Sequence, residues 1–98
     1  MSIRAYKTIK KYSKDNISKK ILLNKEVFTF NDTEILEVFQ KYGVMYTNED
    51  NLGEMEISRE NIEYVLNKNI SNNTKLILNE MLNDLNKTNE EWFLVTTL

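Results

Sequence analysis

The clearest hydrophobic pattern in this chain lies between residues 70 and 85, where apolar positions recur every three or four residues. That spacing is the period of an amphipathic helix, and it continues for about four turns. The positions are Ile70, Thr74, Ile77, Leu78, Met81, Leu82 and Leu85. Ser71 or Asn72 is the expected N-cap of this helix.

Two shorter helices are predicted before it. The first follows the segment 31–34, in which Asn31 is the expected N-cap and Glu34 the acid three residues on. Gly43 is its expected end. Ser58 is the expected N-cap of the second. The inward stripes are Ile35, Val38, Phe39 and Tyr42 in the first helix, and Ile62, Val65 and Leu66 in the second.

Alternating apolar and polar residues predict strands at 3–10, 26–30, 44–47, around Met55 and Ile57, and at 91–97. In the first strand Ile3, Ala5 and Ile9 share one face, and Lys7 interrupts that face, so we expect an edge strand there. The polar segment 48–53 is a predicted turn.

Residues 11–25 fit two patterns. Ile17, Ile21 and Leu22 match a short helix, whereas Ile21 to Leu23 match a strand that pairs with Val27 to Phe30. The sequence leaves this segment open.

Strands at both ends with helices between them predict an α+β fold. We expect one domain over residues 1–98, with a small antiparallel or mixed sheet of 3–5 strands and about three helices packed on one face. The basic N-terminal strand and the aromatic C-terminal strand are candidate neighbours in that sheet.

The amino-acid composition limits the kinds of catalytic and metal site that the chain can form. The chain has no cysteine and no histidine, which argues against disulfides, thiolate or imidazole catalysis and most zinc or copper sites. Its two glycines, Gly43 and Gly53, stand in no phosphate-binding motif. No stretch is long and apolar enough for a signal peptide or a membrane helix. We therefore expect a cytoplasmic protein with no cofactor, no metal and no membrane contact.

Charge is divided unevenly along the chain. Residues 1–26 hold eight Lys or Arg and two Asp or Glu, a net of +6, whereas residues 27–98 hold five and thirteen, a net of −8. The overall formal charge of −2 thus hides a strongly dipolar chain.

The basic segment combines lysines with aromatic rings, as a surface that follows phosphates and stacks on bases would. An edge strand protected by lysines would have the same composition. The candidate nucleic-acid residues are Lys7, Lys10, Lys11, Tyr12, Lys14, Lys19 and Lys20.

The acidic segment is a candidate protein-binding surface, because dense carboxylates complement a cationic groove on another protein, including one that normally holds nucleic acid. Trp92 and Phe93 adjoin on a strand and must face opposite sides, so one is expected in the core and the other is a candidate anchor. The candidate partner-binding residues are Glu49, Asp50, Glu54, Glu56, Glu60, Glu63, Trp92 and Phe93.

A calcium site and an enzymatic site fit the sequence less well than these binding surfaces. The segment 48–59 resembles a calcium loop, but Leu52 stands at a ligand position and Arg59 replaces the bidentate glutamate. Glu54 and Glu56 share a strand face, as paired catalytic carboxylates can, although acids alternating with apolar residues are typical of a solvent-facing strand. We expect a protein that is not an enzyme.

Three segments carry a resemblance: 3–7 (IRAYK), 28–32 (FTFND) and 53–58 (GEMEIS). In these and in the order of its elements the chain resembles small uncharacterised α+β proteins of phages and plasmids from low-GC Gram-positive bacteria. It departs from them in residues 11–25. The resemblance implies a mobile-element protein that binds and blocks a host factor, such as a component of a CRISPR defence system.

Two functions follow as hypotheses. The first is a non-enzymatic inhibitor or adaptor, a monomer or a homodimer, that binds a host protein through the acidic segment. The alternative is a small nucleic-acid-binding protein that uses the lysine-rich segment.

Overall fold

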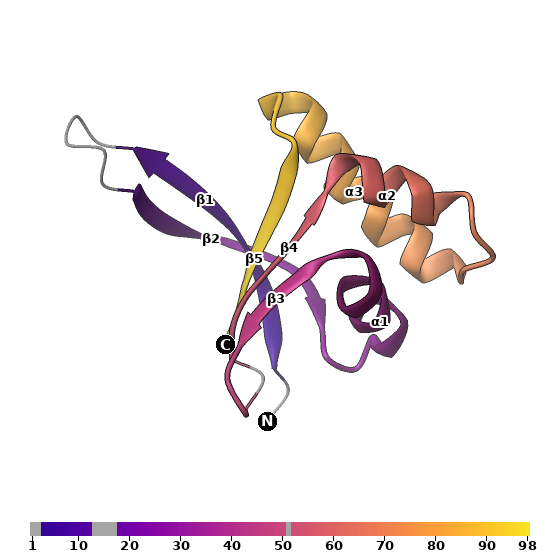
Figure 1. The fold of residues 1–98 in the computed structure, drawn as a ribbon, viewed down its shortest axis with the longest axis horizontal. Helices are drawn as coiled ribbons and strands as arrows, with labels where there is room; N and C mark the ends of the chain where they lie inside the picture. The colour runs from indigo at the N-terminus through magenta and orange to yellow at the C-terminus, as the bar shows by residue number, and fades with distance from the viewer. Residues whose placement is uncertain (1–2, 13–17, 51) are drawn as a thin grey trace.

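The computed structural model describes residues 3–12, 18–50 and 52–98, with the backbone alone for residues 9–24 of these ranges. Its elements follow the chain in the order β1 (Arg4–Tyr12), β2 (Ser18–Thr29), α1 (Thr33–Tyr42), β3 (Val44–Thr47), β4 (Gly53–Ser58), α2 (Arg59–Leu66), α3 (Asn72–Thr88) and β5 (Trp92–Thr97). Helices α1, α2 and α3 gather on one side of the strands (Figure 1). The α+β class is confirmed.

In the described parts of the chain, the sheet has five strands in the order β2-β1-β5-β4-β3, and every neighbouring pair is antiparallel. The N-terminal strand β1 and the C-terminal strand β5 lie side by side near its centre, as the sequence suggested. Because β1 is flanked by β2 and β5, the expected edge strand at residues 3–10 is wrong. The edges are β2 and β3.

Lys7 explains that error. It lies on the face of β1 that the helices cover, where its ammonium is 3.5 Å from Asp84 of α3 and 5.4 Å from the centre of the Phe93 ring. An ion pair and a cation–π contact thus compensate for a lysine at the rim of the core. A cation on an inner face had been interpreted as protection of a sheet edge.

Residues 18–29 form one long strand, β2, which pairs with β1. Ile21 and Leu22 lie in this strand and not in a helix, and Ile21 to Leu23 cannot pair with Val27 because all of them belong to the same strand. Ile17 of the predicted helix lies outside the described residues. The register between β1 and β2 shifts twice, between Ala5 and Tyr6 and between Tyr6 and Thr8. Such bulges bend a strand and increase its twist.

The helix boundaries follow the predicted caps, with one correction. Ser58 accepts from the Asn61 backbone N–H at 3.2 Å, and Ser71 accepts from that of Thr74 at 3.2 Å. The N-cap of α1 is Asp32 rather than Asn31, and its side chain makes no capping bond. Glu34 instead accepts from the backbone N–H and the hydroxyl of Ser71, at 2.9 and 2.7 Å, and so joins the starts of α1 and α3.

Gly43 ends α1 as expected, but with extended backbone (φ −116°, ψ −168°). It is needed there because the chain passes close to β4. A Cβ at this position would lie 2.6 Å from the Glu56 carbonyl oxygen and 3.0 Å from that of Phe39.

The core lies between the helices and one face of the sheet. Each helix contributes its predicted stripe, and the strands contribute alternate residues. Among the described side chains, the buried apolar residues that form this core are Ala5, Phe28, Ile35, Val38, Phe39, Met55, Ile57, Ile62, Val65, Leu78, Met81, Leu85, Phe93 and Val95.

Candidate protein-binding face

The sheet face opposite the helices, which we call the open face, is assembled by strand register. Val44 stands opposite Glu56, and Glu56 opposite Leu94. In the next row Tyr46 stands opposite Glu54, and Glu54 opposite Thr96. Opposed side chains in antiparallel strands have Cβ atoms about 5 Å apart. The two carboxylates of β4 therefore lie between apolar or aromatic residues of β3 and residues of β5.

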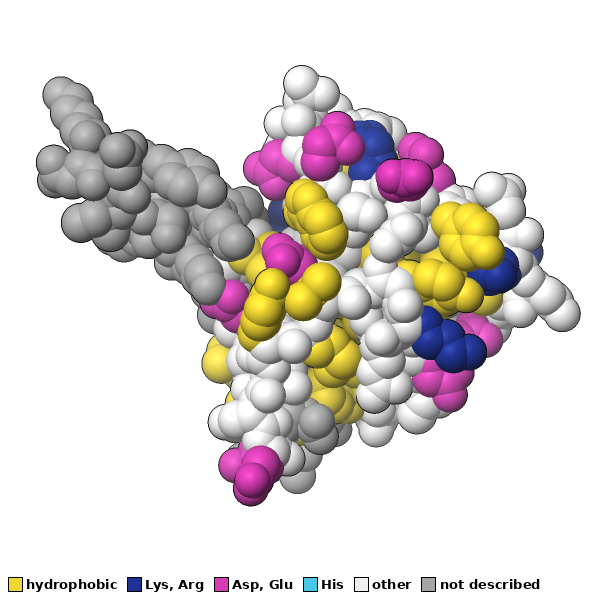
Figure 2. Space-filling view, in the orientation of Figure 1, with side chains coloured by type: hydrophobic (Ala, Val, Ile, Leu, Met, Phe, Trp, Pro, Cys, Tyr) yellow, Lys and Arg dark blue, Asp and Glu magenta, His cyan; other side chains and the backbone are white. Residues whose placement is uncertain are grey.

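Large apolar side chains of this face are accessible to solvent. Tyr46 is 62% exposed, Trp92 47% and Val44 36%, whereas Leu94 is only 7% exposed. A cluster of this kind, with a buried centre and accessible aromatic rings around it, has the composition of a protein-binding surface. Hydrophobic and acidic side chains lie next to one another over the strands in the space-filling view (Figure 2).

The pair Trp92 and Phe93 behaves as the alternation of a strand requires. Phe93 is 1% exposed and packs in the core, so it is not accessible to a partner. Trp92 remains as the exposed aromatic residue of the pair, opposite Ser58 in the register.

The six predicted acidic residues do not form one cluster. Glu54 and Glu56 lie on the open face, and Glu49 and Asp50 lie in the turn between β3 and β4, where Asn48 Oδ1 accepts from the Asp50 and Leu52 backbone N–H groups at 2.9 and 3.1 Å. Glu60 and Glu63 are exposed on α2. Two functional candidates were missed from the sequence, Val44 and Tyr46. Their alternation in the short strand 44–47 was the available signal.

Among the candidate nucleic-acid residues, Lys7 has a described side chain, and its ammonium is paired with Asp84. Lys14 lies outside the described residues. Lys10, Lys11, Tyr12, Lys19 and Lys20 are placed by backbone only: Lys10 stands opposite Lys20, Lys11 opposite Lys19 and Tyr12 opposite Ser18.

Asp84 is a charged centre that the sequence did not reveal. Its Oδ2 is 2.6 Å from the Lys25 ammonium and 3.5 Å from that of Lys7, and its side chain is 13% exposed. Burial raises the pKa of Asp84, but the Lys25 hydrogen bond and the Lys7 charge outweigh burial, so its pKa falls below the ordinary 3.8. This cluster fastens the first two strands to α3.

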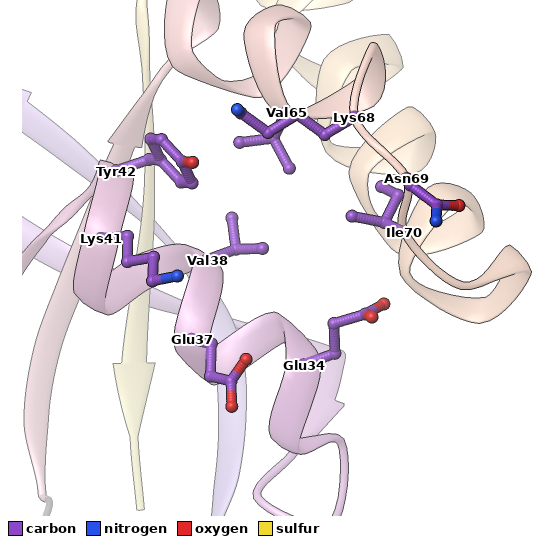
Figure 3. Close-up of a pocket in the computed structure, with 9 residues that line it drawn as sticks. All are labelled: Glu34, Glu37, Val38, Lys41, Tyr42, Val65, Lys68, Asn69 and Ile70. Atoms are coloured by element: carbon purple, nitrogen blue, oxygen red, sulfur yellow. The ribbon is translucent and has the colours of Figure 1, made fainter.

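A hollow lies on the helix side, between α1 and the α2–α3 connection (Figure 3). Lys68 stands over the Tyr64 and Tyr42 rings, 4.6 and 5.9 Å from their centres. At Glu34, hydrogen bonds from Thr74 and Ser71 lower the pKa of the carboxyl group. The lining residues are Glu34, Glu37, Val38, Lys41, Tyr42, Val65, Lys68, Asn69 and Ile70.

Within the described parts of the chain, no three His, Cys, Asp or Glu side chains are grouped so that they could hold a metal ion. No helix in these parts of the chain has the length and apolar character needed to cross a bilayer. In the comparisons with known proteins, no family model, no curated protein and no solved structure matched the chain.

Proposed function

We propose that this protein acts without catalysis, by binding a cationic segment of a larger host protein across the open face of its sheet. The observation that carries the proposal is the placement of Glu54 and Glu56 between exposed Tyr46 and Val44 on one side and β5 on the other. The partner chemistry follows from this arrangement: an extended chain with Lys or Arg alternating with apolar residues.

The physical reasoning has two parts. Trp92 and Tyr46 offer large rings with few rotatable bonds, which bury much area on binding at little entropic cost and also attract cations. The carboxylates add charge complementarity, which favours encounter with a basic partner and disfavours an acidic one. A groove that normally contacts nucleic acid has the required cations, so occupying it would block its usual ligand.

Trp92 is the single tryptophan of the chain, so its fluorescence reports directly on this face. The test is a titration with a short peptide of alternating arginine and valine, compared with a peptide in which glutamate replaces arginine. The basic peptide should change the emission and saturate, and the acidic peptide should not.

Matched variants then locate the site. Glu54→Gln with Glu56→Gln should weaken peptide binding about tenfold, the loss expected for two partly solvated charge pairs. Glu60→Gln with Glu63→Gln removes the same charge from α2 and should leave binding unchanged. Equal losses in the two double variants would show a general charge effect and contradict the proposal.

A further inference from the structure

A second charged feature is the ribbon that β1 and β2 form beyond the rest of the sheet. β5 pairs with β1 only from Ala5 to Thr8, whereas β2 follows β1 as far as Tyr12. We call residues 9–12 and 18–21 the arm. In Figure 1 the arm projects away from the helices and the rest of the sheet, which we call the body. The register shifts between β1 and β2 occur just before it, where they can redirect the two strands.

The arm has an unusual arrangement of charge. Lys10 stands opposite Lys20, and Lys11 opposite Lys19, so two consecutive cross-strand pairs join like charges. Directly opposed like charges destabilise antiparallel strands. Because neighbouring residues of a strand alternate between faces, one lysine pair belongs to each face of the ribbon.

The cations of β1 and β2 that lie near the body have carboxylate partners. Arg4 lies 3.5 Å from Glu26, and Lys7 and Lys25 both lie against Asp84. In the arm, the described register from Ile9–Ile21 to Tyr12–Ser18 contains no acidic residue opposite a lysine. Among the described residues, acids thus lie against Arg4, Lys7 and Lys25, whereas no acid stands opposite a lysine of the arm.

We propose that the arm is a nucleic-acid-binding element that inserts into a groove of a duplex, with Lys10, Lys11, Lys19 and Lys20 contacting phosphates. A two-stranded ribbon fits the major groove of B-DNA. A groove has a phosphate row on each wall, which matches a ribbon with lysines on both faces. A flat anionic surface, such as a membrane, would be contacted by one face only.

The acidic body does not oppose this binding strongly. Four residue pairs of a ribbon extend about 13 Å. Electrostatic interactions at physiological ionic strength are screened over about 8 Å. Phosphates bound near the end of the arm would therefore be largely screened from the carboxylates of residues 27–98. With lysines as the contacts, binding should depend on phosphate charge and little on base sequence.

The test is fluorescence anisotropy of a labelled DNA duplex titrated with the full chain at several salt concentrations. Wild type should bind, with affinity falling as salt rises. Lys10→Gln with Lys20→Gln should bind more weakly and reduce the slope of log K against log salt by about 2, one phosphate contact for each lysine. Lys75→Gln with Lys87→Gln removes equal charge from exposed positions of α3 and should match wild type.

Several outcomes would overturn the proposal: no duplex binding at physiological salt, equal losses in the arm and α3 variants, or tighter binding to single strands or to phosphatidylserine vesicles than to duplex. The Arg–Val peptide titration with the arm variant separates this proposal from the protein-binding one. Peptide binding should persist in that variant, because the peptide site is built from β3, β4 and β5 and the arm extends beyond the part of β1 that pairs with β5.

Discussion

At the scale of single residues, Asp84 shows what a sequence pattern leaves out. Its position on α3 looks like an ordinary exposed one, yet the fold brings two lysines from distant strands to its carboxylate. Lys7 was recognisable as an anomaly because it interrupts an apolar face. Its partner was not, because the partner lies 77 positions away and nothing local links the two.

Replacing Asp84 with asparagine should lower the free energy of unfolding at neutral pH, because Lys7 would stay buried but lose its counter-charge. The expected loss is about 1 to 2 kcal/mol, between the contributions of exposed and of buried salt bridges. Since the pKa of Asp84 is lowered on folding, its contribution is fully present above its unfolded pKa, near 3.8, and is lost as the pH falls through the lower folded value. Urea unfolding at pH 7 and pH 3 measures both effects.

The control for this prediction is Glu80→Gln, an exposed position one turn earlier on the same helix. Wild type and this control should lose more stability between pH 7 and pH 3 than Asp84→Asn does. If all three proteins lost the same amount, the ion pairs of Asp84 would not be the source of the acid sensitivity.

At the scale of elements, the helices could be predicted from the sequence because each has a regular apolar stripe or a strong N-cap residue. Thr74, Leu78, Met81 and Leu85 are buried as their spacing required. The sequence predicted the end of β2, from residue 26 on, but not its first part, because residues 18–25 have neither clear alternation nor a turn signal and their conformation is set by pairing with β1. Local propensity says little about a strand whose pairing partner determines its structure.

The arm gives a prediction at this scale. Lys20→Glu should convert the opposed pair with Lys10 into an ion pair and raise the free energy of unfolding by about 0.5 kcal/mol, while duplex binding falls. Lys20→Gln removes the repulsion without adding attraction and should give an intermediate stability. Urea denaturation and the anisotropy titration provide the two measurements. A decrease in stability for Lys20→Glu would contradict the register on which the arm proposal rests.

At the scale of the whole molecule, the uneven charge of the sequence becomes a separation in space. Lysines of β1 and β2 extend into the arm at one end of the molecule. Glu54 and Glu56 lie on the open face, and Glu49 and Asp50 lie in the β3–β4 turn. Figure 1 shows the positions of these elements. The sequence predicted the helix-covered sheet and the meeting of its two terminal strands. It did not predict which acids share a face, because that depends on the register of β3, β4 and β5.

The open face is tested most directly by backbone amide NMR of the labelled protein titrated with the arginine–valine peptide. The account predicts shifts concentrated in β3, β4 and β5 and in the Trp92 indole N–H, with α2 and α3 nearly unchanged. Shifts centred on Glu60 and Glu63 of α2, or an unperturbed Trp92 indole at saturating peptide, would contradict it.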